Sequence, residues 1–128
     1  MGAERSRLVV ALQAALLRAA SEFGDEEWFA PHHARVLATA AALDYVLMLA
    51  TGTAGVRIPE RDAERAMHEG ITRAVDDLIA CATTIAQSGG PAAVAFARET
   101  AGPLRTVLRQ EALASDERSF AVIALANA

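Results

Sequence analysis

Apolar residues recur along most of the chain at intervals of three and four, and this spacing predicts helices. A helix turns once every 3.6 residues, so such intervals place side chains on one face. We therefore expect a long amphipathic helix over residues 60–88. Its core stripe would consist of Ala63, Met67, Ile71, Ala74, Leu78, Ala82 and Ile85.

Similar spacing predicts helices on both sides of this segment. They cover residues 3–22, 31–51, 92–101, 104–114 and 118–126. Glycine and proline mark the turns between them, and Gly102-Pro103 is expected to break or kink the helix in which it falls. Ser115 followed by two acids is typical of a helix N-cap. Residues 120–125 are also compatible with a strand.

Two of these helices have wide apolar surfaces. The first places five large side chains on one broad arc, and residues 31–51 are apolar on both faces, which is typical of a helix surrounded by others. We therefore expect an all-α fold, in which residues 1–128 form a single domain. It is an up-and-down bundle of four main helices plus a short C-terminal helix, and it dimerises to cover the first arc. That arc consists of Leu8, Val9, Leu12, Leu16 and Leu17.

The outer face of residues 60–88 alternates in charge at intervals of four, through Arg65, Glu69, Arg73 and Asp77. Opposite charges one turn apart stabilise an isolated helix by about 0.3–0.5 kcal/mol per pair. We interpret this face as solvated and self-supporting.

Composition adds to this picture. Of the 128 residues, 53% are apolar and 31 are alanine, while six are aromatic, which favours closely packed helices over a large catalytic cavity. The net charge of −4 speaks against a general nucleic-acid binder. All 12 basic residues are arginine, which together with the alanine content indicates a GC-rich, bacterial genome. A single cysteine cannot form an internal disulfide, so we expect a cytoplasmic protein.

Residues 36–56 form the most apolar stretch, with Asp44 as the one charged residue before Arg57. An aspartate at the centre of a membrane span costs about 2.5–3.5 kcal/mol, which alanine, threonine and glycine do not offset. We therefore expect a buried helix with no membrane contact. Inside it, Asp44 would pair with Arg73 or Arg105, or else anchor a ligand pocket with Tyr45 and Met48.

Trp28 precedes this helix among acidic residues. An aromatic side chain in such a loop most often caps the core, and it is also the type of residue that anchors a protein partner. The adjacent His32 and His33 point about 100° apart on a helix, so they do not form a metal pair, and we expect no metal or other cofactor. Cys81 is expected to be a small core residue.

The sharpest local pattern is His68-Glu69-Gly70-Ile71-Thr72. An acid beside an imidazole orients the ring, and a hydroxyl one turn away can position a phosphoryl oxygen. The pattern resembles the H-E-x-x-T core of histidine-kinase dimerisation hairpins, and a turn with a returning helix follows it. The resemblance implies phosphotransfer through His68, without autophosphorylation because no ATP-binding domain follows.

Arg61 and His68 lie seven residues apart on one helix face. They resemble the R-x(4–6)-H signature of HEPN ribonucleases, in which arginine and histidine from two protomers share a scissile phosphate. The resemblance implies RNA cleavage by these two residues.

Because no complete catalytic constellation is present in the sequence, the function we expect first is a non-catalytic binding or interaction module. Its partner would be a protein or a small apolar ligand. Histidine phosphotransfer and RNA cleavage are the alternatives.

Overall fold

The computed structural model describes residues 2–52 and 58–128, with side chains from Glu4 onward, and it is all-helical there. The glycines and threonines of residues 51–55 predict a loop, which falls partly outside the described residues, as does the end of the apolar stretch 36–56. Residues 120–125 lie in a helix, so the strand alternative is wrong. The five helices are α1 (Gly2–Phe23), α2 (Ala30–Thr51), α3 (Glu60–Ser88), α4 (Pro91–Gln110) and α5 (Asp116–Ala126).

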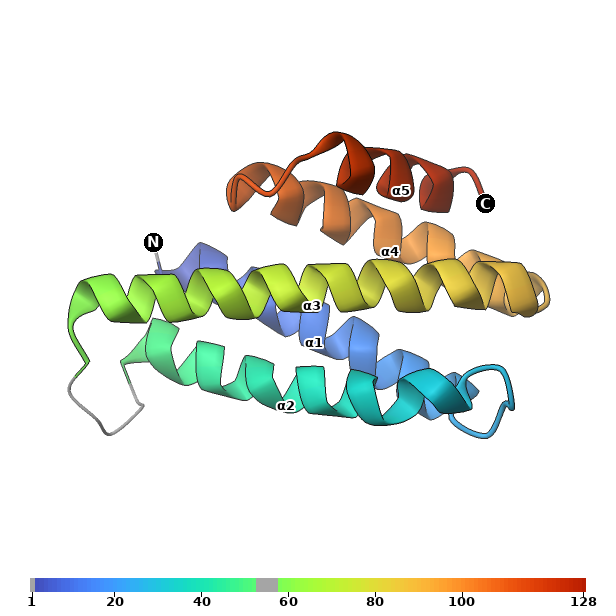
Figure 1. Ribbon diagram of the computed structural model, residues 1–128, viewed down its shortest axis with the longest axis horizontal. Helices are drawn as coiled ribbons and strands as arrows, with labels where there is room; N and C mark the ends of the chain where they lie inside the picture. Colours follow the sequence, from blue (N-terminus) through green and yellow to red (C-terminus); the bar gives the residue numbers. More distant parts are fainter. Residues whose placement is uncertain (1, 53–57) are drawn as a thin grey trace.

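Consecutive helices run in opposite directions (Figure 1). The long helix α3 packs against all four others, and α1 also packs against α2 and α4. The last helix, α5, lies on α4 and α3. Helices α2 and α5 therefore lie at opposite edges of the molecule and do not touch (Figure 1).

Most helix ends lie where the capping and turn residues of the sequence predict them. The expected bounds of the longest helix match α3, and Pro31 lies in the first turn of α2. Gly52 ends α2 with a left-handed φ of 74°, which suits a residue without a Cβ atom. The Ser115 side chain accepts a hydrogen bond from the backbone N–H of Arg118, as an N-cap does.

Of the two effects expected at Gly102-Pro103, the break is wrong, because α4 continues through it, while the kink remains a prediction. A proline inside a helix costs about 3 kcal/mol, since it removes one backbone hydrogen bond and crowds the preceding turn. Here both halves of α4 bury apolar side chains on the same face, including Phe96 and Ala97 before the proline and Leu104 and Val107 after it. Tertiary packing of that face offsets the local cost.

The core contains buried apolar side chains from all five helices. The predicted stripe of α3 is buried from Met67 to Ile85, while Ala63 at its start is partly exposed. Phe96 of α4 packs edge to face against Phe23 of α1, with 5.7 Å between ring centroids. Two of the six aromatic rings therefore close one end of the bundle.

The wide apolar surfaces of α1 and α2 are only half covered. Val9, Leu12 and Leu16 are buried as expected, but Leu17 is 46% exposed. Helix α2 was expected to be surrounded, yet it buries only one side. It is long and apolar enough to pass for a membrane span, with a mean hydropathy of 1.4 over its most apolar window, of which 28% is buried.

Candidate functional site

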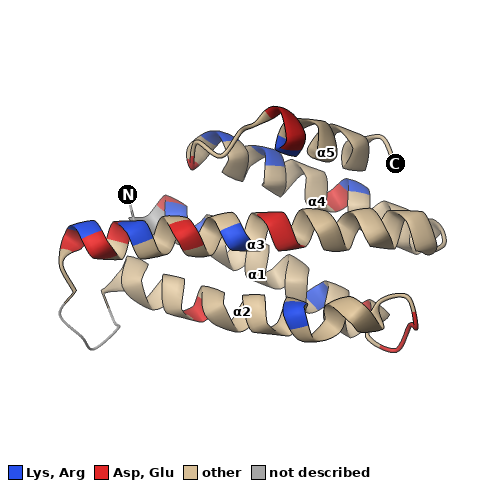
Figure 2. Ribbon diagram, in the orientation of Figure 1, with Lys and Arg blue, Asp and Glu red and all other residues tan. Residues whose placement is uncertain are grey.

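The exposed large apolar side chains of α1 and α2 form one surface, which we call the α1–α2 face. Each of them exposes 39–51% of its area. Helix α2 is almost entirely tan in Figure 2, because its charged residues are only Arg35 and Asp44. The large apolar members of the face are Val10, Leu17, Leu37, Tyr45 and Met48.

A hydrogen bond between the two helices lies within this face. The side-chain Nε2 of Gln13 on α1 donates to the Oδ1 of Asp44 on α2, at 2.6 Å, and to the carbonyl oxygen of Ala40, at 2.8 Å. By helical spacing, Val10 and Leu17 flank Gln13 on α1, while Leu37 and Met48 flank Asp44 on α2. The face therefore has apolar residues around one polar pair.

The expected burial of Asp44 is wrong. Its side chain is exposed, and its described partner is Gln13, whereas Arg73 and Arg105 were the expected ones. Neighbours along its own helix are apolar, but no other helix among residues 2–52 and 58–128 covers that side of α2. Asp44, Tyr45 and Met48 do share one exposed surface, and whether that surface binds a ligand or a partner remains a prediction.

Trp28 lies in the connection between α1 and α2 and is half-buried. Its ring lies 5.6 Å from that of Phe23 and 6.1 Å from that of Phe29. This position agrees with the interpretation as a cap over the core. Its role towards a partner remains a prediction.

The buried acid of the protein is Asp77 on α3, whose side chain is 1% exposed. Its Oδ2 accepts a hydrogen bond from the hydroxyl of Thr39 on α2, at 2.5 Å, and its Oδ1 forms an ion pair with Arg35. The expectation that Asp77 belongs to a solvated charge ladder is therefore wrong. The cation that faces it is itself more than half exposed, so the pair lies at the edge of the α2–α3 contact.

Small residues on α3 bring α2 close enough to cover Asp77. A Cβ atom added at Gly70 would lie 2.5 Å from Cγ2 of Val46 on α2, which is closer than packed atoms allow. Ala74 and Cys81 continue the same side of α3. The sequence signal for this contact is the row of small residues at positions 70, 74 and 81, with Arg35 and Thr39 one turn apart on α2.

His68 is nearly half exposed, and its Nδ1 lies 3.7 Å from Oε2 of Glu111, the residue that caps the C-terminal end of α4. The Thr72 hydroxyl donates to the backbone carbonyl of His68, at 2.7 Å, so it serves its own helix. The acid that approaches the imidazole is thus Glu111, while Glu69 is exposed beside it. Sequence reasoning missed Glu111 because it lies 43 positions further along the chain.

A polar depression of about 450 Å³ joins these residues to the buried acid. Its lining alternates in charge, so it has no uniform preference for anions or cations. It is lined by Arg35, His68, Glu69, Thr72, Arg73, Asp76 and Asp77.

Arg5 of α1 binds Glu64 of α3 and Glu111 at the C-terminal end of α4. Its guanidinium binds both oxygens of Glu111, at 2.7 and 2.9 Å, and also Oε2 of Glu64, at 2.7 Å. These hydrogen bonds favour the ionised carboxylate, so Arg5 holds the pKa of Glu111 below its usual value, against the opposing effect of burial. The cluster ties α1 to α3 and α4.

The remaining candidates are spread over the molecule. Arg61 is exposed in the first turn of α3, so the ribonuclease resemblance has gained no further contact and remains a prediction. Cys81 is buried, as expected of a core residue. Within residues 2–52 and 58–128, no three His, Cys, Asp or Glu side chains lie together in a way that would hold a metal ion.

Comparisons of the chain with protein-family models, with curated proteins and with solved structures found no match.

Proposed function

We propose that this protein is an interaction module that self-associates through the α1–α2 face. In this proposal α1 to α4 form an up-and-down four-helix bundle, and two copies pack these faces together around a two-fold axis. The observation that carries the proposal is the exposure of Leu17 and Leu37 on neighbouring helices of one face. Contiguous exposed apolar residues of this kind are typical of interaction sites.

The size of the face supports a second copy as its occupant. Each helix has 22 residues, and at 1.5 Å per residue two such helices side by side present about 600–700 Å². Standard interfaces bury about 800 Å² per partner, and the smallest stable ones about 600 Å². A pairing of the two faces therefore reaches the lower end of the range for a stable dimer.

The polar pair within the face favours a protein over a bilayer. Asp44 would cost about 2.5–3.5 kcal/mol in the centre of a membrane. In a protein interface it keeps its hydrogen bond to Gln13 and gains polar partners from the other copy. A two-fold axis near this pair would bring each Asp44 close to the Gln13 of its partner.

Sedimentation velocity at tens of micromolar tests the proposal on three chains. The wild type is expected to be a dimer, and Leu37→Glu a monomer, because the new charge would be buried without a partner. Phe120→Glu is the matched control, since Phe120 is 70% exposed on α5 at the opposite edge, and it should remain a dimer.

Three outcomes contradict the proposal. They are a monomeric wild type, a dimeric Leu37→Glu, and a Phe120→Glu chain that has become monomeric. Co-sedimentation of a monomeric wild type with phosphatidylcholine vesicles would assign the face to a membrane instead.

A second candidate function is phosphotransfer through His68, which one observation favours. Glu111 approaches Nδ1 of the imidazole, which leaves Nε2 as the nitrogen for a phosphoryl group, and the side chain is accessible. Incubation with a phosphorylated response regulator should give an acid-labile label on the wild type and none on His68→Ala. Absence of label on the wild type, or equal label on both, would contradict it.

A further inference from the structure

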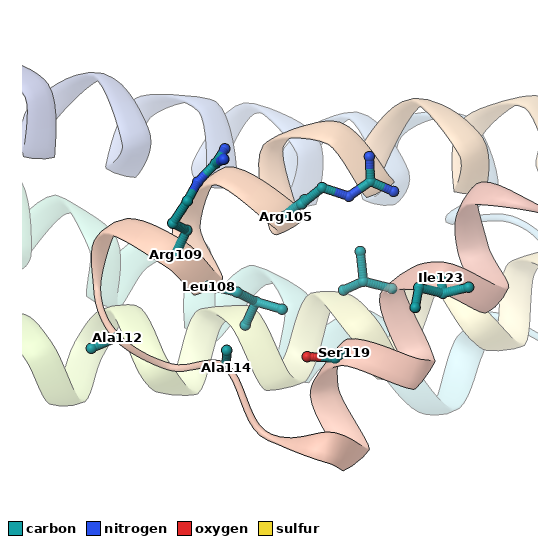
Figure 3. Close-up of a pocket in the computed structure, with 8 residues that line it drawn as sticks. Arg105, Leu108, Arg109, Ala112, Ala114, Ser119 and Ile123 are labelled. Carbon is teal, nitrogen blue, oxygen red and sulfur yellow. The ribbon is translucent and has the colours of Figure 1, made fainter.

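A groove of about 630 Å³ runs between the last turns of α4 and the helix α5. Leu108 and Val122 form its floor and are buried, while Ile123 stands half-exposed at its edge. Figure 3 shows Leu108 directed from α4 into the space that faces Ser119 and Ile123 of α5. The volume lies within the range of small-molecule sites, which are mainly apolar with a few polar groups.

The charged side chains among the described lining residues of the groove are both arginines. Arg105 and Arg109 lie one turn apart on the α4 wall (Figure 3), and no acidic residue is among its described lining residues. Neither guanidinium forms an ion pair with any group in residues 2–52 and 58–128. In a chain of net charge −4, two unpaired arginines beside an apolar floor select for an anionic group.

The walls of the groove are held in place before any ligand binds. Arg118 binds Asp76 of α3 through two hydrogen bonds, at 2.8 and 3.0 Å, and donates a third to the carbonyl oxygen of Leu113, at 3.1 Å. Leu113 itself is buried. These contacts fix the α4–α5 connection against α3, so little ordering cost remains for binding.

Small residues keep the groove open at the connection. Ala112 and Ala114 line it there, and both present only a methyl group. Ala112 has a backbone φ of 54°, in the left-handed region, which residues other than glycine rarely adopt. The chain therefore turns sharply at this point and leaves space between the two helices.

We propose that the groove binds a single-chain acyl carboxylate, with its alkyl chain over Leu108 and Val122 and its carboxylate on Arg105 and Arg109. A guanidinium donates two parallel hydrogen bonds to a carboxylate, which suits this head group. The Ser119 hydroxyl offers a further donor. The site lies on α4 and α5 and makes no use of the α1–α2 face.

Isothermal titration of the full chain with hexanoate, octanoate and decanoate tests the apolar half of the site. Burial of one methylene contributes about 0.8 kcal/mol, so the affinity should rise up to about fourfold with each added methylene. Decanol, which has the chain without the charge, should bind about tenfold more weakly than decanoate.

Variants of the residues that line the groove, each with a matched control, test where decanoate binds. Arg105→Gln and Arg109→Gln should each weaken decanoate binding about tenfold, whereas Arg65→Gln, an exposed arginine of α3, should not. Ile123→Ala should weaken it several-fold, whereas Phe120→Ala, which is more exposed on the same helix but does not line the groove, should not. All these positions are exposed, and circular dichroism checks that each variant is folded.

Any of three results overturns the assignment. They are no heat with decanoate at about 1 mM, an affinity independent of chain length, and equal affinities of the groove variants and their controls. Repeating the decanoate titration on Leu37→Glu tests the groove independently of self-association, because this variant changes the α1–α2 face and leaves the groove intact.

Discussion

Thr39 of α2 donates its hydroxyl hydrogen to the buried carboxylate of Asp77 on α3, across 2.5 Å. Both residues are at most 3% exposed, so the bond lies out of reach of bulk water. Arg35, one turn before Thr39, neutralises the other oxygen of the same carboxylate from the solvent side. The contact between α2 and α3 thus depends on a polar pair that the apolar stripe of α3 does not explain.

Removal of this hydroxyl should destabilise the fold. Thr39→Val keeps the shape of the side chain but leaves a buried carboxylate oxygen without its donor, which costs about 1–3 kcal/mol. Urea unfolding measures the loss. Thr84→Val is the control, because the Thr84 hydroxyl bonds to a carbonyl of its own helix, and its stability should change by less than about 0.5 kcal/mol. Equal effects of the two substitutions would contradict the role of the Thr39–Asp77 bond.

Gly70 and Gly102 should respond differently to alanine. Gly70→Ala would place a methyl group 2.5 Å from the branched side chain of Val46, and such overpacking costs about 1–3 kcal/mol. At Gly102, within α4, a Cβ atom meets nothing within 4 Å outside its own helix and chain neighbours. The gain in helix propensity there is opposed by crowding against the ring of Pro103, which follows directly, so Gly102→Ala should change stability by less than about 0.5 kcal/mol.

Thermal unfolding of both variants gives the comparison. The double variant Gly70→Ala with Val46→Ala should lose less stability than the sum of its two single substitutions, since the clash is then absent. Simple additivity, or a stabilised Gly70→Ala, would show that the helices do not approach closely at this point.

The Arg5–Glu111 contact predicts a dependence of stability on pH. The pKa of Glu111 is lower in the folded chain than in the unfolded chain, because Arg5 hydrogen-bonds to the ionised form. Its contribution is therefore fully present above the unfolded value of about 4.3 and is lost as the pH falls through the folded value. Glu111→Gln should be less stable than the wild type by about 1–3 kcal/mol at neutral pH.

In acid, this difference between Glu111→Gln and the wild type should shrink, because the carboxylate of Glu111 is protonated as the pH falls through its folded pKa. Urea unfolding at about pH 7 and about pH 3 measures the change. Glu69→Gln, at an exposed position of α3, serves as the control and should differ little from the wild type at either pH. A difference for Glu111→Gln that is the same at both pH values would contradict the ion pair.

Cys81 should resist alkylation while the chain is folded. Burial, and to a smaller extent the charge of Asp77, raises the pKa of the thiol to about 12, and the thiolate is the reactive form. With iodoacetamide at about pH 8, labelling should be on the order of a thousandfold slower in buffer than in urea, because the thiolate fraction falls by that factor. A cysteine placed by Ser21→Cys in a Cys81→Ala chain, at an exposed position of α1, should be labelled equally fast in both.

The helices could be predicted because their signals are local. The bounds of α3 and the cap at Ser115 depend on residues within about one helical turn, which are close together in the sequence. The failure at Pro103 has the opposite cause. Proline weakens a helix locally, but the buried side chains on both sides of it depend on α3 and α5, which contribute nothing to the pattern of residues 91–110.

Asp44 and Asp77 show why the burial of a charged residue could not be predicted from the sequence. Asp44 has apolar neighbours on its own helix and is exposed, because none of the described elements covers the outer side of α2. Asp77 has charged neighbours on its own helix and is buried, because α2 crosses over it at the row of small residues beginning at Gly70. Burial is a property of what lies opposite a side chain, and neighbours in sequence do not report it.

Periodicity and capping over a few residues are enough to predict an all-helical chain, most helix ends and the apolar stripe of α3. The packing of the helices, by contrast, buries Asp77 and leaves Asp44 exposed, brings Glu111 and not Glu69 close to His68, and places Arg105 and Arg109 along an open groove. These relationships join residues tens of positions apart, and they exist only after the helices have packed.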